Sequence, residues 1–413
     1  MPRSSTIFAA ALLCCAGQSS AQLGALSSLP GGLPALPDVG SLPAVVDGPV
    51  GTLLDRPLRE IPNVLRQARL DRIDALVRNN RQAVERDVDG APARRGVLLL
   101  VDADAETLAS VAALGFETGS ASPIDGLDLS VNQVTVPNGM SLAAAQNLLR
   151  KKVPAARVSS DQIYFQSGAT NSPVTAAARA SSGPVAAPIG VIDGAPAQPV
   201  TATKGFAKGA PFPSNHGSAV AALAYSVGAR KIYVADVYGT DPAGGNALAI
   251  AQGLGWLLGR GVKVISISLV GPRSPLLERA VASAQARGAV IVAAVGNDGP
   301  AAPPAYPASY SNVLAITGVD KRNRPLIEAG RAAHLDYAAP GAGISALDRT
   351  GKLVPVRGTS FAVPLVAVRV AAALDRGVSP GGVIGALDAE AVQISRRRPD
   401  PQSGRGLVCG ACR

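Results

Sequence analysis

Residues of the three types that carry out acyl transfer occur in the second half of the chain. Asp193 follows the apolar run 189–192, His216 stands in the Ala-rich stretch SNHGSAVAALA, and Ser360 precedes a long apolar segment in RGTSFAVPLVAV. A serine nucleophile needs a histidine base, and the base needs a carboxylate that orients its ring. Because the chain has only two histidines, the base must be His216 or His334.

The surroundings of Ser360 and Asn297 favour the stabilisation of negative charge. Ser360 is predicted at a helix N-terminus, where unpaired backbone N–H groups and the helix dipole attract an oxyanion. Asn297 follows an apolar strand in IVAAVGNDGP, and its amide can donate a hydrogen bond to the same oxyanion. Each residue also has a structural alternative. Ser360 can cap its helix, Asp193 and Asn297 can form turns, and a lone histidine is more often structural.

Short apolar strands alternate with helices from residue 188 onward, and these elements must position the reactive residues. Strands are predicted over 189–192, 231–237, 262–269, 290–295 and 313–319, and helices over 218–227, 247–260 and 276–287. Buried strands that alternate with helices indicate a parallel α/β sheet flanked by helices. Sites in such sheets lie at the carboxyl ends of the strands.

Residues 93–166 have a different and more compact pattern. Strands are predicted over 96–101, 116–120, 127–135 and 157–165, and helices over 105–114 and 141–151, with Ser141 as an N-cap. The order βαββαβ predicts a ferredoxin-like α+β domain. Residues 167–187 are rich in Ser, Ala, Gly, Thr and Pro, which predicts an exposed linker that is open to cleavage.

The first 92 residues divide into three segments. Residues 1–21 combine a positive start, a short apolar stretch and small residues at the end, which is typical of a secretory signal peptide and predicts a secreted or periplasmic protein. Residues 22–57 are a Pro/Gly-rich linker. Residues 58–92 are a basic amphipathic helical segment, for which we expect a solvated helix rather than a membrane-surface role. No later segment is predicted to insert stably into a membrane.

Composition and cysteine usage narrow the partners. The chain has 413 residues, a net charge of +10 and 47% hydrophobic residues, so it can bury a sizeable core. No basic stripe is interleaved with aromatic residues, so nucleic-acid binding is not expected. Cys409 and Cys412 stand at the C-terminus, and no second pair in the body of the chain completes a zinc site. A local disulfide is therefore expected, and no metal site.

These stretches together resemble the subtilisin family of serine peptidases. IGVIDG, HGSAVAA and AAVGNDGP resemble the family's motifs around the aspartate (Asp193), the histidine (His216) and the oxyanion-hole asparagine (Asn297), and GTSFAVP around Ser360 matches the serine motif fully. The order Asp, His, Ser is also that of the family. The resemblance covers about residues 188–390.

The resemblance implies a serine endopeptidase that hydrolyses peptide bonds through an acyl-enzyme, with the catalytic domain at 188–413. It implies a triad of Asp193, His216 and Ser360, with Asn297 in the oxyanion hole, and no cofactor for the chemistry. No calcium-ligand motif supports a structural calcium ion. Residues 93–166 resemble the family's inhibitory prosegment in pattern. The expected partners are therefore a protein or peptide substrate and the chain's own prosegment, in a self-processing monomer.

The resemblance also implies a slot for the substrate residue before the cut bond, between segments 268–271 and 293–296. The substrate-binding residues expected there are Ser268, Leu269, Val270, Gly271, Ala294 and Gly296. The family usually has Gly where this chain has Val270, which predicts a narrowed slot. A shift of the alignment by one residue would instead place Gly271 at the slot wall and Val270 in the core. The family also usually has Ser or Thr where this chain has Gly194, so one support of the aspartate is missing.

Two alternative functions stay open on the sequence. A catalytically silent subtilisin-like binding protein would keep the fold without the reaction. An α/β-hydrolase esterase needs a Gly-x-Ser-x-Gly elbow, which occurs once, at 377–381. This elbow joins no apolar strand to a helix, and no histidine follows it as the hydrolase order requires. Reaction with a serine-directed fluorophosphonate separates the silent protein from the peptidase.

Overall fold

The computed structural model describes residues 60–168 and 183–412, all of which belong to one compact unit of the chain. The expected signal peptide 1–21, the linker 22–57 and most of the linker 167–187 lie outside the described residues. Within the described ranges, no helix is long and apolar enough to cross a membrane.

A parallel sheet of seven strands forms the centre of the second half of the chain, which confirms the predicted α/β class. Its order is β15-β14-β13-β11-β8-β10-β9, and each neighbouring pair is parallel. The strands are β8 (Ile189–Asp193), β9 (Ala202–Gly205), β10 (Ile232–Asp236), β11 (Val264–Ile267), β13 (Val290–Ala294), β14 (Leu314–Val319) and β15 (Tyr337–Pro340). Because β8 lies between β11 and β10, the strand order reverses at β8, where sites of such sheets form.

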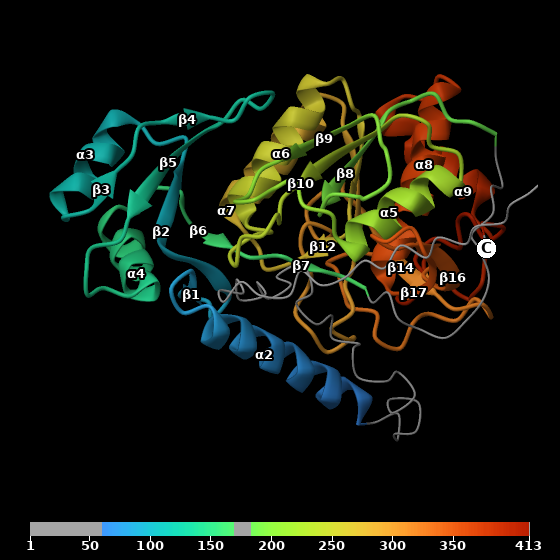
Figure 1. Cartoon of the computed structure of the whole chain (residues 1–413), viewed down its shortest axis with the longest axis horizontal. Helices are drawn as coiled ribbons and strands as arrows, with labels where there is room; N and C mark the ends of the chain where they lie inside the picture. The colour runs from blue at the N-terminus through green and yellow to red at the C-terminus, as the bar shows by residue number, and fades with distance from the viewer. Residues whose placement is uncertain (1–59, 169–182, 413) are drawn as a thin grey trace, which may run out of the picture. The chain divides into compact units, whose positions relative to one another are not determined.

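Helices cover both faces of this sheet (Figure 1). They are α5 (Asn215–Ser226), α6 (Ala247–Gly259), α7 (Pro275–Ala286), α8 (Ala362–Asp375) and α9 (Val383–Glu390). Ile189 and Val191 of β8 pack with α5 and α8, whereas Ile192 packs with α6 and α7. Successive side chains of a strand point to opposite faces, so a strand covered on both sides is apolar throughout.

The start of α5 is set by its N-cap. The Oγ atom of Ser214 accepts a hydrogen bond from the N–H of Gly217 at 2.9 Å. Such a cap stabilises a helix by about 1 kcal/mol. The helix therefore begins at Asn215, three residues before the predicted start, and His216 lies in its first turn.

Residues 84–162 form a second sheet whose pairs are antiparallel. Its strands are β1 (Val84–Arg86), β2 (Pro92–Val101), β3 (Glu117–Thr118), β4 (Ser122–Pro123), β5 (Ser130–Thr135) and β6 (Val158–Gln162). The order is β1-β2-β5-β3, and β6 also pairs with β2 and β4 with β5. Helices α3 (Ala105–Ala113) and α4 (Leu142–Lys152) connect the strands along the chain in the expected order βαββαβ. The predicted cap of α4 is present, since Ser141 Oγ accepts from Ala144 N at 3.2 Å.

Both faces of this second sheet are covered. Leu98 and Leu100 of β2 pack with α3 and α4, and Leu99 and Val101 pack with α6 and α7 of the larger sheet's layer. This explains why the centre of β2 is a continuous apolar run instead of an alternating one. The contacts also join the βαββαβ unit to the second half of the chain.

Two predicted elements differ in the structure. The helical segment predicted over 58–92 is helical only as α2 (Ile61–Asn79), because the backbone and side-chain amides of Asn80 both donate to Leu76 O and end the helix. The strand predicted over 157–165 stops at Gln162. The chain then leaves the sheet and forms β7 (Phe165–Gln166), which pairs with β12 (Leu269–Val270).

Candidate active site

Asp193 and His216 form a buried pair at the carboxyl end of β8. Asp193 is 0% exposed and His216 is 4% exposed. The Nδ1 atom of His216 lies 2.9 Å from Oδ2 and 3.0 Å from Oδ1 of Asp193, and the N–H of Gly194 donates to Oδ1 at 2.7 Å. The Nε2 atom of His216 has no hydrogen-bond partner in the described ranges. The carboxylate therefore holds Nδ1 and leaves Nε2 free to accept a proton.

Ser360 lies in the short 3₁₀ turn Thr359–Phe361 that leads into α8, and its side chain is buried. Its Oγ atom donates to the carbonyl oxygen of Ser167 and lies 3.3 Å from that of Ser268. No hydrogen bond joins this Oγ to His216, although the ring of the next residue, Phe361, lies 5.3 Å from the imidazole between centroids. Transfer of the serine proton thus requires Oγ to turn towards Nε2.

Besides the Oγ of Ser360, two further groups that can donate a hydrogen bond lie near the carbonyl oxygen of Ser167. The backbone N–H of Ser360 donates to it at 3.0 Å. The buried Nδ2 of Asn297 has no partner, while its Oδ1 accepts from Thr359 N at 3.0 Å. A Cβ atom placed on Gly358 would lie 2.7 Å from Asn297 Nδ2 and 2.9 Å from the Ser167 oxygen. The Nδ2 atom and the carbonyl oxygen therefore both lie next to the Cα atom of Gly358. Gly358 itself has a φ of 146°, which glycine adopts without strain.

The segment that contains Ser167 lies beside Ser360 as an added strand. Phe165 pairs with Val270 and Gln166 with Leu269, both antiparallel. The N–H of Ser167 then donates to the carbonyl oxygen of Ser268 at 3.2 Å. Peptides bind to sheet edges through main-chain hydrogen bonds of this kind. The chain's own segment 165–167 pairs with this edge through the same kind of main-chain hydrogen bonds.

Tyr164 anchors this strand at its N-terminal end. Its side chain is fully buried, and its hydroxyl donates to Pro272 O at 2.8 Å. Its carbonyl oxygen accepts from the hydroxyl of Tyr238, also at 2.8 Å. A Cβ atom on Gly271 would lie 2.5 Å from the Tyr164 ring, so the absence of a side chain there makes room for the ring.

Val270 faces Gly296 across the predicted slot. A Cβ atom on Gly296 would lie 3.3 Å from Cγ1 of Val270, and Val270 is 6% exposed. The side chain of Val270 thus occupies space between segments 268–271 and 293–296. Gly271 lies next to the ring of Tyr164. Val270 also belongs to the buried hydrophobic core around the sheet, so its role as a wall of the slot stays a prediction.

Helix α2 contacts both the added strand and the loop after β13. The guanidinium of Arg72 lies 4.4 Å from the centre of the Phe165 ring and donates to the Asp298 carboxylate at 3.0 and 3.2 Å. The Nε of Arg69 lies 3.4 Å from the same carboxylate. Helix α2, which the sequence predicts to be solvated, therefore packs one side against the rest of the chain. Its arginines hold the residue that follows Asn297, a contact that sequence periodicity does not reveal.

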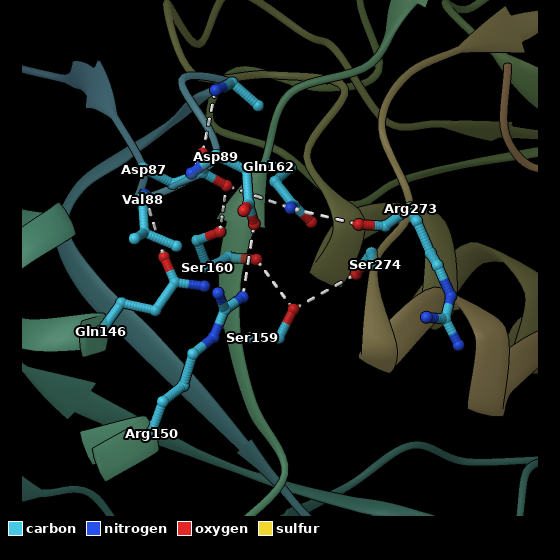
Figure 2. A network of polar contacts seen from close by, with 11 residues as sticks. Asp87, Val88, Asp89, Gln146, Arg150, Ser159, Ser160, Gln162, Arg273 and Ser274 are labelled. Carbon is cyan, nitrogen blue, oxygen red and sulfur yellow. Dashed lines mark hydrogen bonds and ion pairs between the residues drawn. The ribbon is translucent and has the colours of Figure 1, made fainter. Parts of the chain in front are cut away.

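Polar contacts join β6 to the N-terminus of α7 (Figure 2). The Asp87 carboxylate accepts from Gln162 Nε2 at 3.1 Å, and the same Nε2 lies 3.3 Å from the carbonyl oxygen of Arg273. The hydroxyls of Ser159 and Ser274 lie 3.2 Å apart. Since Ser274 caps α7, these contacts place the last strand of the βαββαβ unit against the layer that carries the site.

Asp161, between these residues, is buried at the N-terminus of α6. Its Oδ1 accepts from Leu248 N at 2.9 Å, and its Oδ2 lies 3.5 Å from Nε of Arg94. Burial raises the pKa of Asp161 to about 6, because the loss of water outweighs the attraction of Arg94 and the hydrogen bond from Leu248. The folded chain therefore takes up a proton here at a higher pH than the unfolded chain.

We expect Asp161→Asn to stabilise the uncut Ser360→Ala precursor above pH 6, with the difference vanishing near pH 4. A pKa raised on folding means that the folded state binds more protons between about pH 4 and 6, so stability falls as pH rises through that window. The neutral amide of the Asp161→Asn chain cannot ionise, so the variant avoids this loss in the free energy of unfolding, which is about 1–3 kcal/mol. Urea unfolding of both chains across that pH range measures it. Asp89→Asn, at an exposed carboxylate of the same unit, is the control; an equal pH slope with and without Asp161 would contradict the assignment.

The second histidine and the two C-terminal cysteines lie outside the site around Ser360. Nε2 of His334 donates to Val313 O at 2.8 Å, so His334 is not the partner of Asp193. Cys409 and Cys412 are joined as a disulfide. Within residues 60–168 and 183–412, no group of three His, Cys, Asp or Glu side chains is arranged to hold a metal ion.

Comparison with known proteins finds similarity to subtilisins and related proteases. Residues 203–380 match the model of the subtilase family, a range that contains His216, Asn297 and Ser360 and begins after Asp193. The chain is 37% identical to subtilisin BL of Lederbergia lenta over 155 residues and 33% identical to thermitase of Thermoactinomyces vulgaris over 183 residues. The second half of the chain is therefore similar to the subtilases, the family of the subtilisins and thermitase.

The extent of these matches is partial. They cover 36% of this chain and 57% of subtilisin BL, and 44% of this chain and 64% of thermitase. The chain thus spans about three fifths of the length of these relatives. The crystal structure of fervidolysin from Fervidobacterium pennivorans has a similar fold, with a TM-score of 0.64 at 18% identity over 80% of this chain and 63% of that chain.

Proposed function

We propose that this protein is a secreted subtilisin-type serine endopeptidase, made as a precursor that cuts its own chain between Ser167 and Gly168. One observation carries the proposal. The carbonyl oxygen of Ser167 accepts from the backbone N–H and from the Oγ of Ser360, while the N–H of Ser167 donates to Ser268 O. The peptide bond after Ser167 is thus held next to Ser360 by hydrogen bonds, and the backbone on its N-terminal side is fixed in an added strand. This arrangement positions the bond for attack by Ser360.

The proposed reaction uses side chains of this chain alone. Ser360 Oγ adds to the Ser167 carbonyl carbon, and its proton passes to Nε2 of His216, while Asp193 stabilises the imidazolium. Asn297 Nδ2 and the Ser360 N–H donate to the oxyanion. The bond to the Gly168 nitrogen then breaks, and the amine takes the proton from His216. Water hydrolyses the acyl-enzyme in the reverse sequence of proton transfers.

Gly168 suits the position after the cut bond. A Cβ atom on Gly168 would lie 2.6 Å from the buried ring of Phe361, and one on Gly358 would lie 2.6 Å from Gly168 Cα. The backbone can approach Ser360 this closely because neither glycine carries a side chain.

The βαββαβ unit and α2 act, on this proposal, as the inhibitory prosegment. The strand that follows β6 occupies the cleft, and Arg72 fixes Phe165 against it, so the unit blocks other substrates until it is released. The triad comes from a single chain, which favours a monomer. Secretion rests on the signal peptide predicted at 1–21.

The proposed function is tested on the secreted full-length chain. Its first cleavage product is expected to begin at Gly168, and the processed protein is expected to digest casein and to be labelled on Ser360 by a fluorophosphonate. A protein that is cut elsewhere by host enzymes, and that neither binds the probe nor digests casein, would be the silent subtilisin-like binding protein.

Val270→Gly is expected to widen the specificity of the processed enzyme at the residue before the cut bond. Val270 fills space opposite Gly296, so the unaltered slot should accept small residues such as the Ser167 of the chain itself. Removing three carbons should raise the relative kcat/KM for Phe over Ala by roughly 10- to 100-fold.

A series of peptide substrates with Ala, Val, Leu or Phe before the cut bond measures the change. Val270→Ala is the intermediate control, and a graded response is expected. Lower thermal stability with an unchanged preference would mean that Val270 only packs the core.

A further inference from the structure

The side chain of Gln166 reaches the catalytic carboxylate. Its Nε2 donates to Oδ1 of Asp193 at 2.9 Å. The backbone of Gln166 pairs with Leu269 in the added strand, directly before Ser167. The placement of this side chain thus follows from the strand's register, and any peptide bound in that register places its own residue at the same point.

The rest of the chain leaves this oxygen without an equivalent donor. In the described ranges, the side-chain carboxylate of Asp193 otherwise accepts only from His216 Nδ1 and from the backbone N–H of Gly194. Gly194 has no side chain to offer, and a Cβ atom there would lie 2.4 Å from Oγ of Ser214. That Oγ is already engaged as the cap of α5, where it accepts from Gly217 N.

We propose that glutamine two residues before the cut point of a substrate is a positioning residue for Asp193, and that this position determines specificity. The inference rests on the proposed peptidase function and extends it to a substrate class. The glutamine amide supplies, from the substrate, a hydrogen bond that fixes the carboxylate. The carboxylate in turn holds the tautomer and orientation of the His216 ring.

This role makes a distinctive kinetic prediction. An amide that only fills a subsite improves binding of the substrate and of the transition state alike, which lowers KM. An amide that orients Asp193 acts in the step in which the imidazolium forms, so its loss lowers kcat. Methionine matches glutamine in length but has no donor. Glutamate matches it in shape but places a negative charge beside the buried carboxylate.

The test uses the processed enzyme obtained from the full chain and the peptides Tyr-Phe-Xaa-Ser-Gly-Ala, where Xaa is Gln, Met or Glu. We expect kcat to fall about tenfold from Gln to Met, because a hydrogen bond to a charged group is lost, and to fall further with Glu. Equal kcat values, or a difference confined to KM, would overturn the inference. If the processed protein cleaved neither the peptides nor casein, the proposed peptidase function itself would be wrong.

A second arm uses the precursor. Gln166→Met and Gln166→Glu chains are expected to cut themselves about tenfold more slowly or worse. The same substitutions in a Ser360→Ala background give the thermal unfolding temperature of the uncut chain. Slower cutting at an unchanged unfolding temperature supports the positioning role, whereas cutting at the unaltered rate overturns it.

Discussion

A Ser360→Ala precursor is expected to remain one uncut chain under conditions in which the unaltered chain yields a fragment that begins at Gly168. The substitution removes the Oγ that contacts the Ser167 carbonyl but keeps the backbone N–H that binds it, so the strand should stay in the cleft. Removal of the serine of subtilisin costs about 2 × 10⁶ in kcat, and a loss of about that order is expected here. Mass spectrometry of the chain over time measures it.

Two controls isolate the cause. Ser379→Ala, at the serine of the single Gly-x-Ser-x-Gly sequence, should process like the unaltered chain. The cleavage rate of the unaltered chain should not depend on its concentration, because the bond and the nucleophile belong to one molecule. Equal processing of the Ser360→Ala and unaltered chains in a protease-free translation system would rule out self-cleavage by Ser360.

Asn297→Ala is expected to lower turnover by about 10² to 10³, the loss measured for the corresponding donor in subtilisin. The physical reason here is the unpartnered, buried Nδ2 beside the Ser167 carbonyl oxygen. This donor gains a partner as the oxyanion forms, so its loss should appear in kcat with little change in KM. Steady-state kinetics on a single peptide measures both.

Asn297→Asp provides the matched comparison. It keeps an oxygen that can accept from Thr359 N, as Oδ1 of Asn297 does at 3.0 Å, but it removes the donor and adds a charge. Both variants should lose turnover, whereas only the alanine variant also loses the contact with Thr359. Turnover that is unchanged in Asn297→Ala would mean that another group binds the oxyanion.

Local patterns were enough to predict most of the framework. The alternation of apolar runs and helices predicts the parallel sheet. Asp193 is expected at the carboxyl end of a strand because it follows the apolar run 189–192, and it is the last residue of β8. His216, Asn297 and Ser360 are each indicated by the residues around them, and the structure brings His216 to Asp193 and Asn297 to the turn that contains Ser360. These residues lie in short segments whose chemistry and secondary structure are set by their immediate neighbours.

Other features depended on residues that are far apart in the sequence. Nothing in the stretch 157–166 indicates that the strand breaks after Gln162 and that Phe165 then pairs with Val270. The contacts of Arg72 with Asp298 and of Gln166 with Asp193 likewise join the two halves of the chain. The proximity of the Val270 side chain to Gly296 likewise joins two segments that are separate in the sequence.

The division has a physical reason. Caps, turns and amphipathic periods are satisfied within a few residues, so the amino-acid sequence of this protein determined its helices, its strands and the types of its reactive groups. Strand pairing between distant segments depends on which polar backbone edges remain unpaired once both sheets have packed against α6 and α7. Only the tertiary structure therefore decided that the open edge at Ser268 and Leu269 is filled by Gln166 and Ser167, and which bond lies against Ser360.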